Sequence, residues 1–257
     1  MGPPDTWDQL AEFLRGVPDL LPAGVEQIVV VSGHHESDRV EITSTPAPDL
    51  LFDYYGFPEH TYRLRYPAPG SPELATRIGA LLDGAGIANR CDEHRGLDHG
   101  VFVPFMLAFP DATKPIVQVS MRHDLDPRFH LAVGQALTPL RDEGVLVVGS
   151  GMSYHNMRAF GSSRAIADSE RFDAWLTAAC TGPPTTRDAA LSAWEAAPVA
   201  RAAHPREEHL IPLMVTAGAA VGERGHRIFS GEAMGARISA FAFGELVASP
   251  KRSGLEQ

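Results

Sequence analysis

Short apolar, β-branched runs alternate along the chain with longer segments whose apolar residues recur every three or four positions. The first run, residues 25–33, ends in Ser32 and Gly33 and predicts a buried strand closed by a tight turn. Later runs of the same kind predict strands at 40–43, 115–121, 145–149 and 237–243. The pattern therefore predicts strands spread over the whole chain.

The segments between these strands have the spacing and end signals of amphipathic helices. Asp5 is the expected N-cap of a first helix that Gly16 ends. Further helices are predicted at 71–84, 126–143, 165–181, 186–197 and 205–218. Alternating strands and helices, without a linker or repeat, predict a single α/β domain with a mostly parallel or mixed central sheet and helices on both faces. We place this domain at residues 1–248 and expect a loose C-terminal tail at 249–257.

The acidic composition limits the partners of the chain. Its 257 residues carry 22 Lys and Arg against 32 Asp and Glu, and the net charge of −10 disfavours nucleic acid and anionic membranes. No run reaches the roughly 20 apolar residues of a membrane span, and the first residues lack a secretory signal. Cys91 and Cys180 are expected as free thiols. These features predict a cytoplasmic protein and leave the formation of a homo-oligomer open.

Histidines follow two of the predicted strands. His34 comes directly after the first strand, and His155 comes after the strand-like segment 144–151. A third, His209, lies in a distant polar segment. Because ligands and catalytic groups gather at the carboxyl ends of strands in α/β sheets, the three imidazoles indicate a metal or acid–base site. The alternative is that each is a turn or cap residue, since the chain has 11 histidines.

Four motifs lie in order along most of the chain. They are DYYGFPE (53–59) with RYPAPGS (65–71), GLDHG (96–100) before Val103 and Pro104, LRDEG (140–144) with GSG (149–151) and His155–Asn156, and HPREEHLIPL (204–213). In these motifs the chain resembles the class III extradiol ring-cleavage dioxygenases of the LigB superfamily, in the DOPA-dioxygenase-like branch. The resemblance implies that residues 1–248 form an extradiol dioxygenase-like catalytic domain.

The resemblance also implies a set of site residues. It makes His34 and His209 metal ligands, and His155 an acid–base catalyst that is an additional ligand in some zinc-loaded relatives. His99 would line the pocket and hydrogen-bond the substrate or O₂. The implied cofactor is non-haem Fe(II), with Zn(II) as an alternative ion, and the implied substrates are a small catecholic molecule and O₂. An imidazole suits the proton transfer because it titrates near neutral pH.

Some of these residues have other interpretations. His99 would instead hydrogen-bond a backbone carbonyl in a turn, and His155–Asn156 would form a capping pair. We expect Glu208 behind the ligands rather than among them, and His204 at a helix entry. Four arginines are candidates for a substrate carboxylate or for the surface: Arg65, Arg95, Arg122 and Arg158.

The chain departs from the family at its start. Members open with a strand and a His-Gly loop that supplies the remaining ligand, whereas here His34 is the first histidine. We expect a truncated start, and in this chain impaired activity. The alternatives are a non-catalytic ligand- or protein-binding member of the fold and, third, a zinc hydrolase. In this chain, His34 and His209 should point into one cavity, with His155 and His99 on its wall. The ring nitrogens of His34 and His209 should lie less than about 8 Å apart.

Overall fold

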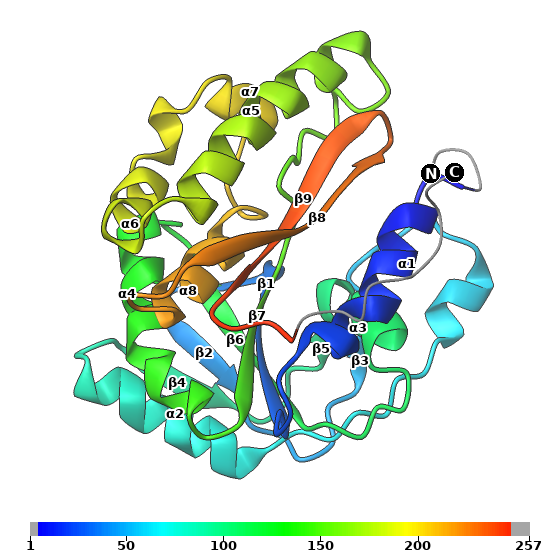
Figure 1. Ribbon diagram of the computed structural model, residues 1–257. Coiled ribbons are helices and arrows are strands. Elements are labelled where there is room, and N and C mark those ends of the chain that lie inside the picture. Colours follow the sequence, from blue (N-terminus) through cyan, green and yellow to red (C-terminus); the bar gives the residue numbers. More distant parts are fainter. Residues whose placement is uncertain (1–4, 248–257) are drawn as a thin grey trace.

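A five-stranded mixed sheet forms the centre of the computed structural model, which describes residues 5–247 (Figure 1). In sheet order the strands are β4 (Asn89–Asp92), β2 (Val40–Thr43), β6 (Ile116–Arg122), β1 (Gln27–Ser37) and β7 (Val145–Ser150). β1 is parallel to β6 and β7, and β2 is parallel to β4 but antiparallel to β6. The expected α/β fold with a mixed central sheet is confirmed.

Alternate residues of β1 face two separate cores. Val29 and Val31 pack in a core with α2 (Pro72–Gly84), α4 (Pro127–Leu137), α5 (Ser163–Thr181) and α8 (Ile211–Ala219). Ile28 and Val30 pack in a second core, against α3 (His99–Ala108). Helices therefore cover both faces of the sheet, as expected.

Smaller elements complete the described part of the chain. The strands β8 (Gly225–Ala233) and β9 (Ala236–Phe243) form an antiparallel hairpin that packs on α5 (Figure 1). Two short strands, β3 (Leu50–Leu51) and β5 (Leu97–Asp98), pair in parallel. The remaining helices are α1 (Asp8–Gly16), α6 (Pro184–Ser192) and α7 (Ala200–Ala203).

The first predicted strand is longer than the sequence pattern indicated. The expected turn after Gly33 is wrong, because β1 continues to Ser37. Its register with β6 shifts between Val31 and Glu36, so that five steps along β1 match two along β6. The polar residues that broke the apolar pattern form a wide bulge in the strand rather than ending it.

The predicted helix at 205–218 is also wrong in its first part. Residues 205–210 form bends and a turn, and α8 begins only at Ile211. Pro205 disfavours helical geometry at the residue before it, whereas Pro212 lies in the first turn of α8, where a missing N–H is tolerated. His209 therefore lies on a turn just before a helix.

Other boundaries differ in smaller ways. Asp5 is not an N-cap, since α1 begins at Asp8 and its cap position, Trp7, makes no side-chain hydrogen bond. The helix expected at 126–143 ends at Leu137 and continues as a 3₁₀ turn that contains Pro139. The sequence pattern did not predict β4, β8 or α3; α3 carries a proline inside it, and the apolar positions of β8 are interrupted by exposed polar ones.

Three further expectations concern the chain as a whole. Among the described residues, no helix is both long and apolar enough to cross a membrane. Cys91 and Cys180 are free thiols, as expected. The division into a domain at 1–248 and a tail at 249–257 stays a prediction, and the tail lies outside the described residues.

Candidate metal and active site

His34 lies inside the bulge of β1, near the carboxyl end of the sheet. Within the described strands, residues 33–35 have no register partner on β6 or β7. The backbone of His34 bonds to side chains instead: its N–H donates to Ser32 Oγ at 3.2 Å, and its carbonyl accepts from Arg95 Nη2 at 3.2 Å. The bulge thus frees the His34 side chain from the alternation of the strand and re-aims it.

His209 and His155 lie on two segments that meet beyond β7. A Cβ at Gly151 would stand 2.1 Å from the carbonyl oxygen of His209, and a Cβ at Gly149 would stand 2.5 Å from that of Pro212. The GSG motif is therefore a packing requirement, because only residues without a side chain let the end of β7 come this close to the turn before α8. His155 is anchored by its N–H, which donates to Ala203 O at 3.0 Å.

His99 is the first residue of α3 and follows the cap position, Asp98. A Cβ at Gly100 would stand 2.9 Å from His34 Cδ2 and 2.5 Å from Ser32 Oγ. The Asp-His-Gly sequence thus lets the start of α3 lie directly against the ring of His34.

The four histidines predicted from the sequence come together in one cluster. The ring centroids of His34 and His209 lie 4.8 Å apart, edge to face, and those of His34 and His99 lie 4.0 Å apart. His155 stacks on His209 at 3.5 Å. The expected proximity of His34 and His209 is met, while the role of each histidine stays a prediction.

The possible ligand atoms of the cluster fall into two sets. Within each set, one atom per residue lies within 4.8 Å of the others: His34, Asp53 and His99 form one set, and His155, Glu208 and His209 form the other. The predicted ligands are thus divided between two sets, which meet where His34 contacts His209.

Two carboxylates hold the outer histidines. Asp53 Oδ1 accepts from the backbone N–H of His99 at 3.1 Å and lies 2.7 Å from its Nδ1. Glu208 Oε1 lies 3.0 Å from Nδ1 of His155. Glu208 was expected behind the ligands, whereas Asp53 was expected only as the first residue of the DYYGFPE motif (53–59). No spacing in the sequence links Asp53 to His99.

The surroundings favour neutral rings at His34 and His209 beside ionised carboxylates at Asp53 and Glu208. Burial, together with His155 and His34 nearby, lowers the pKa of His209 to about 2. Burial and then His99 also lower the pKa of His34. Burial opposes ionisation of Asp53 and Glu208, but the hydrogen bonds from His99 and His155 outweigh it and hold both carboxyl pKa values below their usual range.

This donor set fits a divalent transition metal. Nδ1 of His209 is buried without a hydrogen-bond partner among the described residues, and a neutral imidazole offers a lone pair to a metal. Neutral nitrogen ligands with nearby carboxylates suit Fe(II) and Zn(II). His34 and His209 are therefore able to act as ligands, with His155 beside them.

Other candidates have structural partners. The ring of His99 bonds to the carboxylate of Asp53 rather than to a backbone carbonyl. Asn156 bonds to a distant helix, since its Nδ2 donates to Ala202 O of α7 at 2.8 Å, while His155 faces Glu208. His204 is fully buried, with its Nε2 3.1 Å from Ser153 O. Arg122 pairs with Asp124.

The DYYGFPE motif (53–59) forms a loop that packs against the histidine cluster. The ring of Tyr54 lies 5.5 Å from that of His99, edge to face, and its hydroxyl donates to Thr61 O at 2.6 Å. The loop is thus fixed against the cluster by its own hydrogen bonds.

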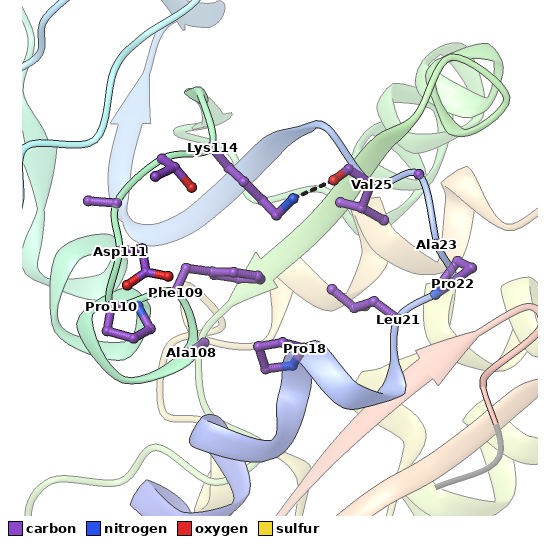
Figure 2. Close-up of a pocket in the computed structure, with 13 residues that line it drawn as sticks. Pro18, Leu21, Pro22, Ala23, Val25, Ala108, Phe109, Pro110, Asp111 and Lys114 are labelled. Atoms are coloured by element: carbon purple, nitrogen blue, oxygen red, sulfur yellow. Dashed lines mark hydrogen bonds between the residues drawn. The ribbon is translucent and has the colours of Figure 1, made fainter.

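A cavity elsewhere is not part of this site. Figure 2 shows it, about 460 Å³ in volume, between residues 18–25 and 108–114. Its lining contains no histidine, and its charged side chains are Asp111 and Lys114. These segments lie before the starts of β1 and β6, at the amino ends of the strands, whereas α/β sheets bind ligands at the carboxyl ends.

A match to a protein family establishes which class of protein this is. Residues 5–242 match the model for the catalytic LigB subunit of aromatic ring-opening dioxygenases. The chain belongs to the LigB family. As a member of it, the protein is an extradiol-type aromatic ring-opening dioxygenase, and the LigB family is metal-dependent. The resemblance found in the sequence motifs is confirmed.

Individual relatives agree with this assignment. The chain is 42% identical over 197 residues to a 4,5-DOPA dioxygenase extradiol of Beta vulgaris, covering 75% of this LigB protein and 72% of the relative. It is 38% identical over 240 residues to the dioxygenase tasH of Hapsidospora irregularis, covering 88% and 73% of the two chains. The crystal structure of the uncharacterized protein JW3007 from Escherichia coli K12 superposes with a TM-score of 0.70 at 28% identity, covering 92% and 90%.

Proposed function

We propose that this LigB dioxygenase opens a catecholic ring with O₂ at Fe(II) held by His34 and His209. The observation that carries the proposal is the edge-to-face contact of these two rings, 4.8 Å between centroids, inside a cluster whose other histidines are held by carboxylates. The relatives named 4,5-DOPA dioxygenases support a catechol as the substrate class. Bound Fe(II) would keep open positions for both catechol oxygens and O₂.

His155 is the proposed acid–base catalyst. Glu208 is an acceptor only when ionised, so the hydrogen bond at 3.0 Å places a proton on Nδ1 of His155, and the tautomer used in the proposed step has its lone pair on Nε2. Nε2 then takes a proton from a catechol hydroxyl and later returns it to the ring-opened product. Glu208 stabilises the imidazolium between these two steps.

His99 is the proposed contact for the substrate or O₂. Asp53 orients it in the same way, through the ring Nδ1 at 2.7 Å and the backbone N–H at 3.1 Å. These two bonds fix both the ring of His99 and the first residue of α3. Nε2 of His99 is then the ring nitrogen proposed to contact the substrate or O₂. The two outer histidines thus face the substrate from different elements.

We further propose that the described residues hold Fe(II) weakly, because they supply two proposed imidazole ligands, His34 and His209, with His155 beside them. Zn(II) is the alternative ion, since imidazole binds it as well.

The test is turnover by protein reconstituted with Fe(II) without oxygen. On addition of O₂ and a panel of catechols, we expect O₂ uptake in proportion to the formation of a yellow semialdehyde. His209→Gln should abolish both signals, whereas His226→Gln, at an exposed position on β8, should leave them unchanged.

Three outcomes would contradict the proposal. O₂-independent turnover with Zn(II) would indicate a hydrolase. Binding of a catechol without O₂ uptake would indicate a non-catalytic member. Equal activity of the His209→Gln variant and the unsubstituted protein would remove His209 from the site.

A further inference from the structure

A buried carboxylate lies behind the histidine cluster and is not used in the chemistry above. Asp98 is fully buried at the cap position of α3, directly before His99. Its Oδ1 accepts from Ser32 Oγ at 2.7 Å, and its Oδ2 accepts from Gln118 Nε2 and from Arg95 Nη2, the latter at 3.3 Å. These three donors come from β1, β6 and the loop before β5. One side chain therefore joins three elements to the start of α3.

The same partners hold both backbone polar groups of His34. Ser32 Oγ, which donates to Asp98, accepts from the His34 N–H at 3.2 Å. Arg95 Nη2, which also donates to Asp98, donates to the His34 carbonyl at 3.2 Å. The bulge removes His34 from the ladder of the sheet, so these side-chain bonds take the place of the missing strand partners.

Close packing connects the same unit to the ring of His34. A Cβ at Gly100 would stand 3.1 Å from Asp98 Oδ1 and 2.9 Å from His34 Cδ2, so the carboxylate and the imidazole line one tight contact. A shift of the Asp98 carboxylate would therefore move His34, through the bonds of Ser32 and Arg95 to its backbone. It would also move His99, which directly follows Asp98 in the chain.

We infer that Asp98 is a positioning residue that sets the bulge carrying His34 and the start of the helix carrying His99, and thereby the metal affinity of the site. Outer partners that fix the ligands of a metal typically change its affinity by about 10–100-fold when they are removed. The inference deepens the proposed function and rests on it for the metal, though not for the placement of the rings.

The experiment compares Asp98→Asn with a matched buried carboxylate. Asp173, on α5, is also buried and also accepts from a serine and an arginine, Ser239 Oγ at 2.5 Å and Arg227 Nη1 at 3.3 Å. Both variants lose one buried charge between the same kinds of donors. Only Asp98 is bonded to the partners of His34, so a difference between the variants reports positioning rather than general stability.

Two readouts are taken on the full chain. The first is Co(II) affinity, followed by visible absorption: Asp98→Asn should weaken it about 10-fold or more, and Asp173→Asn should leave it within about two-fold even if its melting temperature falls equally. The second is NMR of the histidine ring nitrogens in metal-free protein. Asp98→Asn should shift the signals of His34 and His99 and leave that of His130 in place.

Each result decides the inference. Unchanged Co(II) affinity and ring signals in Asp98→Asn, or equal losses in Asp173→Asn, would overturn it. If Asp98→Asn does not fold, Ser32→Ala removes the bonds of Ser32 Oγ to Asp98 and to the His34 N–H but leaves those of Arg95 in place. It should give the same two changes at smaller size; their absence would overturn the inference. If the unsubstituted chain binds no Co(II), the proposed metal site fails, and the ring signals alone decide the role of Asp98.

Discussion

The two halves of the site are built in different ways. His34 and His99, on β1 and α3, are fixed by hydrogen bonds that converge on Asp98 and Asp53. In the other half, the turn that carries His209 is fixed mainly by close approach of backbones at Gly149 and Gly151, with His155 bonded to Ala203 O and Glu208 beside it. The first half should therefore be sensitive to changes of charge and hydrogen bonding, and the turn of His209 to changes of volume.

The largest effect is expected from Gly151→Ala. Its Cβ would stand 2.1 Å from the carbonyl oxygen of His209, and a backbone atom cannot move away alone. We expect a loss of about 3 kcal/mol in the free energy of unfolding, together with loss of metal binding. Thermal unfolding and Co(II) titration measure the two. Gly84→Ala is the control, because nothing lies within 4 Å of its Cβ, and an equal loss there would refute the packing argument.

A change of charge in the same half is expected to act on catalysis. Glu208→Gln keeps the size of the side chain but removes the charge that stabilises protonated His155. In the iron-loaded enzyme kcat should fall by about 10–100-fold, with the melting temperature nearly unchanged. Glu195→Gln changes an exposed carboxylate and should have no such effect. A kcat for Glu208→Gln equal to that of the unsubstituted enzyme would mean that His155 does not need its partner.

Gly100→Ala adds a methyl group in the first half of the site, as Gly151→Ala does in the second. The nearest atoms to its Cβ, at 2.5 and 2.9 Å, belong to the side chains of Ser32 and His34, which have more freedom than a backbone. We expect a stability loss of only about 1 kcal/mol but a fall of about 10-fold in Co(II) affinity, since the ring of a proposed ligand is displaced. A stability loss as large as that of Gly151→Ala would erase the distinction between the halves.

Lowering the pH should destabilise the protein through two buried histidines near the site, and this is the smallest of the expected effects. Burial lowers the pKa of His35 and of His204 to about 4 from the ordinary value of 6.5. Between pH 4 and 6.5 the unfolded chain therefore binds more protons than the folded protein, so the free energy of unfolding is highest above this window and falls as the pH drops through it. From pH 7 to pH 6, each histidine should lower the free energy of unfolding by about 0.7 kcal/mol. The dependence of melting temperature on pH should flatten in His204→Gln, and an unchanged slope would contradict this account.

Much of this organisation was visible in the sequence. His34 was found as the residue after an apolar run, and His99, His155 and His209 stand in the motifs of the family resemblance. The apolar runs predicted four of the five strands of the sheet. The glycines of GSG and GLDHG were visible as motifs, but their reason was not. It lies in atoms of His209, Pro212 and His34 that approach them from other parts of the chain.

The rest depends on contacts that no local pattern records. The bulge in β1 needs side-chain bonds from Ser32 and Arg95 to replace a ladder, and the sequence shows only polar residues after an apolar run. Asp98 lies in the GLDHG motif, which does not indicate its burial, and it is buried because Gln118, Ser32 and Arg95 supply its donors. Asp53 meets His99 across 46 positions of the chain.

A crystal structure of the Fe(II)- or Co(II)-loaded protein, with the ion located by anomalous scattering, tests the central claim most directly. We predict one ion within about 2.0–2.2 Å of a nitrogen of both His34 and His209. An ion held by His155, Glu208 and His209 without His34, or by His34, Asp53 and His99 without His209, would contradict it.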